Sequence, residues 1–514
     1  MSNFDLSLQV FEFLKASGTK TVVVCAGARN APLVMALQKE NFKIYSYFEE
    51  RSAAFFALGL IQSKQEPVAI ITTSGTAVAE LLPAAIEANY QGLPLILITA
   101  DRPKNFRGSG APQTIEQVGL FSQYVEATHD LDVYSENIRI FWSLTKPIHL
   151  NICFDEPLLD EPSQQQVQKV QFHRIKNLEA KTLGEIEATN PLIVVGSLDS
   201  SQTVAVIEFI LKSKTRVFAE STSQLRALKI LKPYLLESTD ELIAALFRMQ
   251  KFQSVIRIGG IPTLRFWRDL EKEFNAFPVF HFTKLKYSGL ARASSVFAIT
   301  ELEKVKVVKD ESGVAEIIQW DQNLQLKKTE LIKKFPLSEP AFVSHLSRQM
   351  GQQSVYLGNS LPIRHWDQFS HGESQLVYAN RGANGIDGQI STYLGWSESL
   401  AAYFFLVGDL TALYDLASLG LTAQLAPQVR KIIIINNFGG QIFSRILKND
   451  LFINAHKTQF KHWAAMWGWN YMQVLSEKDF SSMGQESAII ELVPDAAQTK
   501  MFYKEWDEAC RKAL

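Results

Sequence analysis

The chain has 514 residues, of which 46% are hydrophobic and 20% are charged, as is ordinary for a water-soluble globular protein of two to four domains. Its formal net charge of −1 excludes the strongly basic surface expected of a protein that binds nucleic acid or an anionic membrane. The three cysteines, Cys25, Cys153 and Cys510, show no CxxC spacing, which argues against a disulfide framework and against a zinc site.

The first 180 residues alternate helical patterns with β-branched runs. Residues 1–18 predict an amphipathic helix that ends at Gly18, and they lack the basic start and the cleavage site of a signal peptide. No apolar run is long enough to span a bilayer, so we expect a cytoplasmic protein with no membrane insertion. Strands are predicted at 21–25, 43–48, 68–73, 95–100 and 148–153, with helical patterns at 31–40 and 51–64.

The same alternation restarts twice further along the chain. Strands are predicted at 191–196, 216–221, 254–260 and 279–283, and again at 354–360, 376–382, 403–410, 431–440 and 488–492. Polar stretches at 173–190 and roughly 300–340 fit linkers better than surface helices. The pattern predicts an α/β fold with mostly parallel sheets in three domains, 1–180, 190–335 and 340–514.

Two strand ends in the third block carry oxygen ligands. One predicted strand ends at Gly408-Asp409, and Asn437 follows Asp409 by 28 residues at the end of the next strand. The carboxyl ends of parallel strands open at one edge of a sheet, where ligands bind. A carboxylate, an amide oxygen and a backbone carbonyl, together with diphosphate oxygens and water, suit octahedral Mg²⁺. Either dipeptide alone is more often a simple turn after a buried strand, whereas the ordered pair favours a metal and diphosphate site.

At this point the chain resembles the thiamine-diphosphate enzyme superfamily, whose metal motif is GD followed by NN. The resemblance implies thiamine diphosphate with Mg²⁺, or Mn²⁺ in its place, held by Asp409, the side chain of Asn437 and the backbone carbonyl of Gly439. It also implies cofactor contacts at Thr76, Gly408 and Ile386, the last as the apolar wedge that bends the cofactor into a V. The implied fold has pyrimidine-binding, central and diphosphate-binding domains.

Such a cofactor needs a carboxylate beside its aminopyrimidine ring, and an apolar setting that raises the carboxyl pKa suits this role. In the segment 43–60 a strand is followed by Glu49, Glu50 and a helix rich in small residues. On local evidence these acids are equally good helix caps. The superfamily places its activating glutamate here, so the resemblance assigns Glu50, with Glu49 as the second choice. It also implies a site shared between the first domain of one subunit and the third domain of another, and therefore at least a homodimer.

The resemblance narrows to one family along most of the first and third domains, through CAGARNAPL (25–33), FEER (48–51), GAPQTIEQ (110–117), GNSLPIR (358–364), NRGANGIDG (380–388) and NNFGGQIF (436–443). This family comprises the menaquinone-pathway synthases that make 2-succinyl-5-enolpyruvyl-6-hydroxy-3-cyclohexene-1-carboxylate. They decarboxylate 2-oxoglutarate and add the resulting succinic semialdehyde carbanion to isochorismate in a 1,4 sense. Both substrates are dicarboxylates, which guanidinium groups bind well. The resemblance implies catalysis by Gln113 and substrate contacts at Arg29, Arg102, Arg265, Ser360, Arg364, Arg381, Ile442 and Phe443.

The chain departs from the family pattern in two loops. Ala28 stands in GARN where the family has a serine, and we expect Asn30 to compensate for the lost hydroxyl. In Thr263-Leu264-Arg265-Phe266 only Arg265 keeps the charge of a basic pair. Taken singly, each arginine is more often a surface residue, and Ile386, Ile442 and Phe443 fit core packing equally well. The alternatives are another thiamine-diphosphate decarboxylase or carboligase and, less favoured, a non-catalytic binding protein of the same fold.

Overall fold

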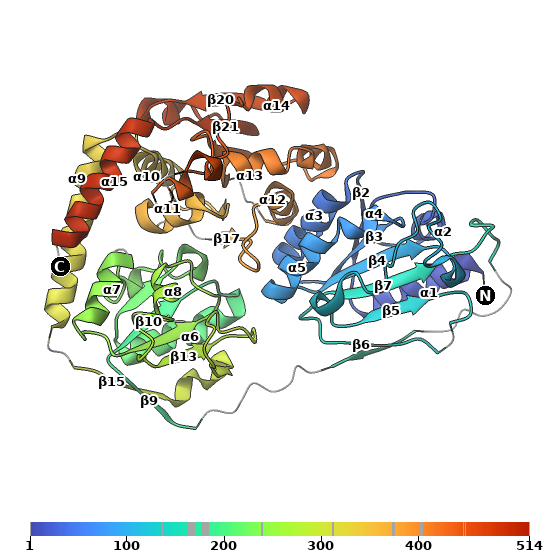
Figure 1. Cartoon of the computed structure of the whole chain (residues 1–514), viewed down its shortest axis with the longest axis horizontal. Coiled ribbons are helices and arrows are strands. Elements are labelled where there is room, and N and C mark those ends of the chain that lie inside the picture. Colours follow the sequence, from blue (N-terminus) through green and yellow to red (C-terminus); the bar gives the residue numbers. More distant parts are fainter. Residues whose placement is uncertain are drawn as a thin grey trace. The chain divides into compact units, whose positions relative to one another are not determined.

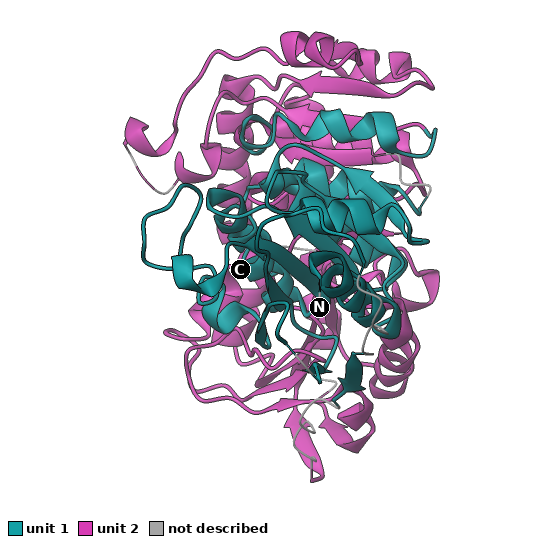
Figure 2. Cartoon of the chain, turned by 90° about the vertical axis from the view of Figure 1, so that its right-hand side faces the viewer, with its two compact units in different colours: residues 1–178, 382–401, 411–428 teal, residues 179–381, 402–410, 429–514 magenta. Residues whose placement is uncertain are grey.

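The computed structural model describes residues 2–135, 137–162, 170–175, 184–237, 240–310, 313–372, 376–400, 404–445, 447 and 449–512 (Figure 1). The chain divides into two compact units (Figure 2). Unit 1 comprises residues 1–178, 382–401 and 411–428, and unit 2 comprises residues 179–381, 402–410 and 429–514. Within the described residues, no helix is both long and apolar enough to cross a membrane.

A six-stranded parallel sheet forms the centre of unit 1, in the order β2-β1-β3-β4-β7-β5. Its strands alternate with helices because each parallel pairing needs a crossover connection. The strands are β1 (Thr21–Val24), β2 (Lys43–Ser46), β3 (Val68–Thr72), β4 (Leu95–Asp101), β5 (Thr128–Leu131) and β7 (Ile148–Cys153). The helices are α1 (Asn3–Ala16), α2 (Ala31–Leu37), α3 (Glu50–Lys64), α4 (Thr76–Ala79), α5 (Leu82–Gln91), η1 (Lys104–Phe106) and η2 (Ser122–Tyr124). A separate pair joins β6 (Arg139–Trp142) to β8 (Gln171–Arg174).

Unit 1 also holds α12 (Gln389–Ser397) and η6 (Ser418–Gln424), and α13 (Asp409–Tyr414) begins in unit 2 and ends in unit 1. Helices α3 and α12 pack closely because both carry glycine at their contact. A Cβ on Gly59 would meet the backbone of Thr392, and a Cβ on Gly395 would meet the backbone of Phe56. These positions therefore accept only glycine without a shift of one helix.

The described residues of unit 2 form two large parallel sheets and one small parallel pair. The first has the order β11-β10-β12-β13-β14, with β10 (Pro191–Val195), β11 (Val217–Ala219), β12 (Ser254–Ile258), β13 (Val279–Phe282) and β14 (Val296–Phe297). Beside it, β9 (Ile186–Thr189) pairs with β15 (Val305–Val308). Its helices are α6 (Ser200–Ser213), η3 (Ser221–Ser223), η4 (Lys229–Leu231), α7 (Asp240–Arg248), α8 (Phe266–Asp269) and η5 (Ile299–Lys304).

The second sheet of unit 2 has the order β17-β16-β18-β19-β21-β20. Its strands are β16 (Val355–Leu357), β17 (Val377–Ala379), β18 (Phe404–Gly408), β19 (Lys431–Ile435), β20 (Asn470–Val474) and β21 (Ala488–Leu492). The helices are α9 (Val314–Lys334), α10 (Glu339–Met350), α11 (Leu361–Phe369), η7 (Gln441–Phe443), η8 (Asp450–Phe452), α14 (Lys461–Met466), η9 (Glu477–Ser482) and α15 (Ala496–Lys512).

The predicted α/β class with parallel sheets is confirmed, and each predicted strand overlaps an observed one. The expected linker at 300–340 is wrong for most of its length, because α9 occupies residues 314–334 and packs beside α15 (Figure 1). Its apolar residues Ile317, Leu324 and Leu331 join the core that α7, α8 and α15 share. Of the other expected linker, 173–190, residues 176–183 lie outside the described residues.

Candidate functional site

The predicted site residues of unit 1 follow successive strands at one edge of its sheet. Arg29 follows β1, Glu50 follows β2, Thr76 follows β3, and Arg102 follows β4. Because the four strands are parallel, their carboxyl ends open at the same edge. The topology therefore gathers residues that are far apart in the sequence.

Glu49 and Glu50 have different roles at the start of α3. Glu49 is the N-cap, and its carboxylate accepts hydrogen bonds from the backbone N–H groups of Arg51 and Ser52 at 3.2 and 3.0 Å. Glu50 is the first residue of the helix and is partly buried. Burial raises the pKa of its carboxyl, its own backbone N–H opposes the shift, and the charge of Glu49 adds to it. The capping interpretation thus accounts for Glu49, whereas burial shifts the pKa of Glu50 in the direction that suits an activating carboxyl.

Thr76 and Gln113 belong to two loops that meet at Gly75. Gly75 precedes α4 with φ of +84°, and a Cβ there would lie 3.2 Å from the Cα of Gln113, itself at φ of +56°. The buried side chain of Gln117 ties these loops together: Oε1 accepts from Gly75 N at 3.0 Å, and Nε2 donates to Ala100 O at 3.1 Å. Thr76 and Gln113 are exposed, so they are free to contact a bound molecule.

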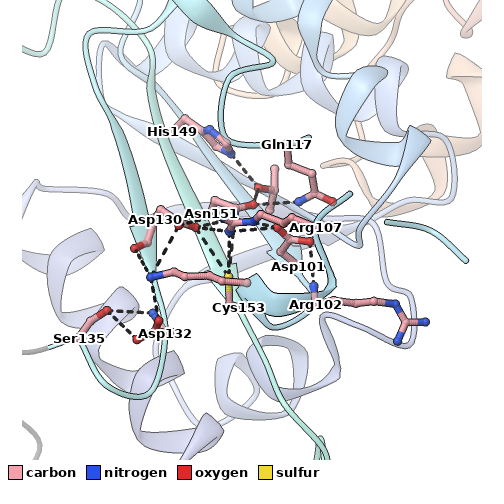
Figure 3. A network of polar contacts seen from close by, with 12 residues as sticks. Asp101, Arg102, Arg107, Gln117, Asp130, Asp132, Ser135, His149, Asn151 and Cys153 are labelled. Atoms are coloured by element: carbon pink, nitrogen blue, oxygen red, sulfur yellow. Dashed lines mark hydrogen bonds and ion pairs between the residues drawn. The ribbon is translucent and has the colours of Figure 1, made fainter. Parts of the chain in front are cut away.

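A polar network below the end of β4 holds the segment that carries Arg102 (Figure 3). The Asn151 amide donates to Asp101 at 3.0 Å and to Asp130 at 2.9 Å, and Arg107 makes a bidentate pair with Asp130 at 2.9 and 2.7 Å. Burial raises the pKa of Asp101, whereas Arg107 and Asn151 overcome burial and hold the pKa of Asp130 below its usual value. Asp101 in turn accepts from the backbone N–H of Arg102 at 2.8 Å.

Arg29 is nearly buried and donates to the Phe154 carbonyl at 3.3 Å. Burial, together with the nearby charge of Arg102, lowers its pKa, so the two guanidinium groups form a cationic pair at this edge. Asn30 does not supply the expected compensation for Ala28. Its Oδ1 accepts from Gly27 N at 2.8 Å, its Nδ2 donates to Cys25 O at 2.9 Å, and the residue is fully buried. Both polar groups of the Asn30 side chain are therefore used in hydrogen bonds within its own loop.

The predicted metal ligands of unit 2 meet at the carboxyl edge of its second sheet, after β18 and β19. Asp409 is buried, and its Oδ2 accepts from Gly439 N at 2.9 Å and lies 3.2 Å from His456 Nε2. Burial raises the pKa of Asp409, and the N–H groups of Gly439 and Leu410 oppose the shift. Gly439 has φ of +142°, and a Cβ there would lie 2.5 Å from the Ile453 carbonyl. Only glycine fits at this close approach.

The two neighbouring asparagines are not equivalent. Asn436 is fully buried and donates to Thr458 O at 3.0 Å and to Glu491 Oε1 at 2.6 Å. Asn437 donates through Nδ2 to Glu339 Oε2 at 2.9 Å. A carboxylate only accepts, so the amide NH₂ must face Glu339 and the oxygen must face away. That Oδ1 is shielded from solvent and has no hydrogen-bond partner among the described residues, as a metal ligand would require.

An outer layer of side chains supports Asn437. Glu339 begins α10 and lies 2.9 Å from His365 Nδ1 on α11, and His365 Nε2 lies 2.5 Å from the hydroxyl of Tyr503 on α15. Such partners orient the groups that bind a metal. Among the described residues, no group of three or more His, Cys, Asp or Glu side chains could hold an ion. The fit therefore depends on an amide oxygen and a backbone carbonyl beside Asp409.

Three predicted substrate residues lie near the same edge of unit 2. Arg364 donates to the Ser360 carbonyl at 2.6 Å, and Arg381 donates to Asn359 Oδ1 at 3.0 Å. Loss of solvent and the charge of Arg381 lower the pKa of Arg364, so these two guanidinium groups also act on each other. Paired cations of this kind are suited to carboxylate ligands.

The remaining predicted residues differ in exposure. Ile386 and Ile442 are partly buried, whereas Phe443 is 41% exposed and its ring lies 6.0 Å from that of Phe452. Arg265 precedes α8 and is exposed. The positions of Ile442, Phe443 and Arg265 beside strand ends are compatible with contacts to a bound molecule.

Sequence reasoning missed several supporting residues. Gln117, Asn151 and Glu339 are buried, and each fixes a predicted site residue or its loop through a side-chain hydrogen bond. Asp415 is fully buried and joins α3 to α12 through Ser52 at 2.9 Å and Ser391 at 3.0 Å. Gln117 lies within GAPQTIEQ and was therefore within reach of sequence reasoning. The other partners are distant in sequence and carry no local pattern.

Comparison with known proteins identifies the family. Residues 5–120 match the family model described as "Thiamine pyrophosphate enzyme, N-terminal TPP binding domain". A protein of Bdellovibrio bacteriovorus, 45% identical over 99% of both chains, is named 2-succinyl-5-enolpyruvyl-6-hydroxy-3-cyclohexene-1-carboxylate synthase. This chain belongs to that synthase family.

Two further relatives carry the same name. One, of Akkermansia muciniphila, is 37% identical over 93% of this chain and 94% of its own length. The other, of Staphylococcus epidermidis, is 32% identical over 85% of this chain and 84% of its own. The chain is therefore an enzyme of a thiamine-pyrophosphate-dependent synthase family, as the sequence predicted. The matched N-terminal domain contains Glu50, Thr76 and Gln113.

Proposed function

We propose that this synthase decarboxylates 2-oxoglutarate and joins the remaining four-carbon unit to isochorismate, giving 2-succinyl-5-enolpyruvyl-6-hydroxy-3-cyclohexene-1-carboxylate and CO₂ for menaquinone biosynthesis. The observation that carries the proposal is the membership of the synthase family along the whole chain. The residues described above are compatible with it, because the chain offers an activating carboxyl, metal ligands and two pairs of cationic side chains.

Thiamine diphosphate, when bound, supplies a carbon nucleophile that takes up the electrons released by decarboxylation. In this proposal Glu50 holds a proton at the aminopyrimidine ring, and burial raises the pKa of its carboxyl, which favours that role. Gln113 contacts the reacting groups, and Thr76, Gly408 and Ile386 contact the cofactor. Gly75 supports this assignment because it brings the Thr76 and Gln113 loops together.

We propose that Mg²⁺, or Mn²⁺ in its place, is held by Asp409, Asn437 Oδ1 and the Gly439 carbonyl. The unpartnered Oδ1 of Asn437 supports this set, because a shielded acceptor without a donor is costly unless a cation occupies it. Oxygen ligands of this kind fit a small hard cation. The metal would neutralise the diphosphate and anchor it beside the second sheet of unit 2.

Both proposed substrates are dicarboxylates. We assign their recognition to Arg29, Arg102, Arg265, Arg364 and Arg381, with Ser360, Ile442 and Phe443 beside them. Burial and the charge of Arg102 lower the pKa of Arg29, and burial and the charge of Arg381 lower the pKa of Arg364, which supports this assignment. Adjacent guanidinium groups repel each other unless an anion neutralises them.

The test is to supply the purified chain with 2-oxoglutarate, isochorismate, thiamine diphosphate and Mg²⁺ and to follow the loss of isochorismate absorbance. We expect loss that requires all four components. Turnover of pyruvate without consumption of isochorismate would favour another decarboxylase or carboligase. Cofactor binding without turnover of either kind would favour a binding protein.

The proposal also includes self-association, a cytoplasmic location and the division into domains 1–180, 190–335 and 340–514. Exposed aromatic residues near the proposed site residues support self-association: Phe48 is 69% exposed, and Phe438 is 39% exposed. Light scattering of the purified chain tests it, with a monomer as the contrary result. The free, buried cysteines are compatible with a reducing compartment.

A further inference from the structure

The turn Thr263–Phe266, which follows β12, carries Arg265 between two carboxyl groups. We propose that Glu220, together with Asp240, is a positioning residue that fixes this turn so that Arg265 meets a substrate carboxylate. The inference rests on the proposed function, which assigns Arg265 to substrate. It concerns two acids that no sequence motif singled out.

Glu220 holds the beginning of the turn. It follows β11, and its Oε1 accepts both the backbone N–H and the hydroxyl of Thr263, the latter at 2.6 Å. Glu220 is only 2% exposed. A buried carboxylate that accepts two hydrogen bonds from one residue restrains both its backbone and its side chain.

Asp240 holds the other end of the turn. Its Oδ1 accepts from the backbone N–H of Phe266 at 3.0 Å, where α8 begins. Phe266 and Trp267 are buried in the core that α7 and α8 share. Within the turn, Arg265 is the one exposed residue, while Leu264 and Phe266 are buried and Thr263 is partly buried. Glu220, Asp240 and the packing of the buried residues thus restrain the backbone of the turn. The side chain of Arg265 remains exposed.

The turn also lies beside the helix that carries another proposed substrate arginine. Thr263 Oγ1 lies 3.4 Å from Asp367 Oδ2, on the helix α11 that also carries Arg364. Asp367 has partners of its own, accepting from Ser221 N at 2.7 Å and pairing with Arg226 at 3.6 Å. The single hydroxyl proton of Thr263 therefore goes to Glu220, the nearer acceptor.

Burial and the neighbouring Asp367 raise the pKa of Glu220 to about 7, while Arg381 and Thr263 oppose the shift. Burial raises the pKa of Asp240 to about 6, and the backbone N–H groups of Phe266 and Arg265 oppose that shift. Burying such acids costs stability, because their hydrogen bonds offset the loss of hydration only in part. Holding the turn that carries Arg265 is a role that accounts for both acids at these positions.

The experiment compares Glu220→Gln and Thr263→Ala with Asp321→Asn, a control that alters another buried carboxylate accepting a backbone N–H, that of Glu237 at 3.2 Å. Arg265→Ala should raise KM for one dicarboxylate about 10-fold or more, because it removes charge-assisted hydrogen bonds. Glu220→Gln and Thr263→Ala should raise KM for that same substrate about 3- to 10-fold with kcat within about 2-fold. The control should leave both constants unchanged.

A double-mutant cycle separates positioning from a general loss of structure. If Glu220 acts through Arg265, Glu220→Gln should not raise KM further in the Arg265→Ala background. Equal effects in both backgrounds, or none, would overturn the positioning role while leaving the proposed function intact. An Arg265→Ala variant with unchanged KM would remove Arg265 from the substrate site and overturn this inference with it.

The rate of tryptic cleavage at the Arg265–Phe266 bond reports how readily the turn opens, independently of enzyme activity. We expect faster cleavage there in Glu220→Gln and Thr263→Ala, and unchanged cleavage after the exposed Arg248. Unchanged cleavage after Arg265 would overturn the inference. Because Thr263→Ala removes only one hydroxyl, it keeps the test decisive if Glu220→Gln does not fold. Failure of the wild-type chain to turn over substrate would count against the proposed function alone.

Discussion

The carboxylate of Asp409 accepts a hydrogen bond from the backbone N–H of Gly439 at 2.9 Å, which joins the ends of β18 and β19. The bond places the Gly439 backbone beside a buried acid, in a conformation with φ of +142°. A metal ligand set built from this loop therefore depends on the absence of a side chain at position 439.

Gly439→Ala should unfold more readily than the wild type and bind Mg²⁺ and cofactor more weakly. The added Cβ would lie 2.5 Å from Ile453 O, and overpacking of this kind costs about 1–3 kcal/mol beyond the backbone strain. Gly468→Ala is the matched control, with φ of +69° and no atom within 4 Å of the added Cβ. It should lose only about 1–2 kcal/mol. Urea unfolding measures both, and equal losses would contradict the close approach at Gly439.

Asn437→Ala should mainly weaken cofactor binding, whereas Asn436→Ala should mainly lower stability. Without Oδ1 of Asn437, Mg²⁺-dependent binding of thiamine diphosphate should weaken by at least about 10-fold, as calorimetry would show. Asn436→Ala should mainly lower stability, by about 1–3 kcal/mol, because Glu491 Oε1 and the Thr458 carbonyl lose the Asn436 amide as a donor. Unchanged metal dependence in Asn437→Ala would remove that residue from the ligand set. Asp409→Ala should lose the same metal-dependent binding.

Glu50→Gln should reduce turnover by about 10²–10⁴-fold while the fold is retained, because the amide cannot hold the required proton. Glu49→Ala should keep turnover but lose about 0.5–2 kcal/mol of stability, because the start of α3 loses its cap. Steady-state kinetics and thermal unfolding on both variants measure the two effects. A reversal, with Glu49→Ala inactive and Glu50→Gln active, would reassign the activating carboxyl.

Gln117→Leu should destabilise unit 1 and thereby weaken the proposed contacts that Gln113 and Thr76 make with the cofactor and the reacting groups. The substitution leaves the Gly75 N–H without its acceptor and the Ala100 carbonyl without its donor, at about 1–3 kcal/mol for each buried group. Gln123→Leu is the control, because Gln123 is exposed in the nearby η2 and should change stability by less than about 0.5 kcal/mol. Thermal unfolding with and without cofactor separates the two, and equal shifts would contradict a role for Gln117.

Glu220 should make the chain less stable as the pH rises from about 4.5 to about 7. Its pKa is about 7 in the folded chain against an ordinary value of 4.5, so in this window the folded state binds more protons than the unfolded state. The contribution of Glu220 to the free energy of unfolding is greatest below pH 4.5 and declines until the pH passes 7. Unfolding free energies of Glu220→Gln across this range should decline less with pH than those of the wild type. Parallel curves would contradict the raised pKa.

The sequence alone predicted the α/β class, the parallel strands and the family, because these depend on local patterns. A buried strand, a glycine turn and a helix start each leave a signature within a few residues, and the motifs around Glu50, Asp409 and Asn437 lie at such points. The error at residues 300–340 has the same origin, since a helix with few apolar residues looks polar in sequence although α9 buries one face against α15.

The tertiary structure decided which of two similar neighbours has which role. Glu49 rather than Glu50 is the cap, Asn436 rather than Asn437 is held by Glu491, and Asn30 is occupied within its own loop. It also joined Glu220 to Thr263 and Glu339 to Asn437 across long stretches of chain. These outcomes depend on hydrogen bonds between residues distant in sequence and on the burial that shifts carboxyl pKa values. Neither is encoded in a local pattern, because the partners meet only when the strands have been assembled into sheets.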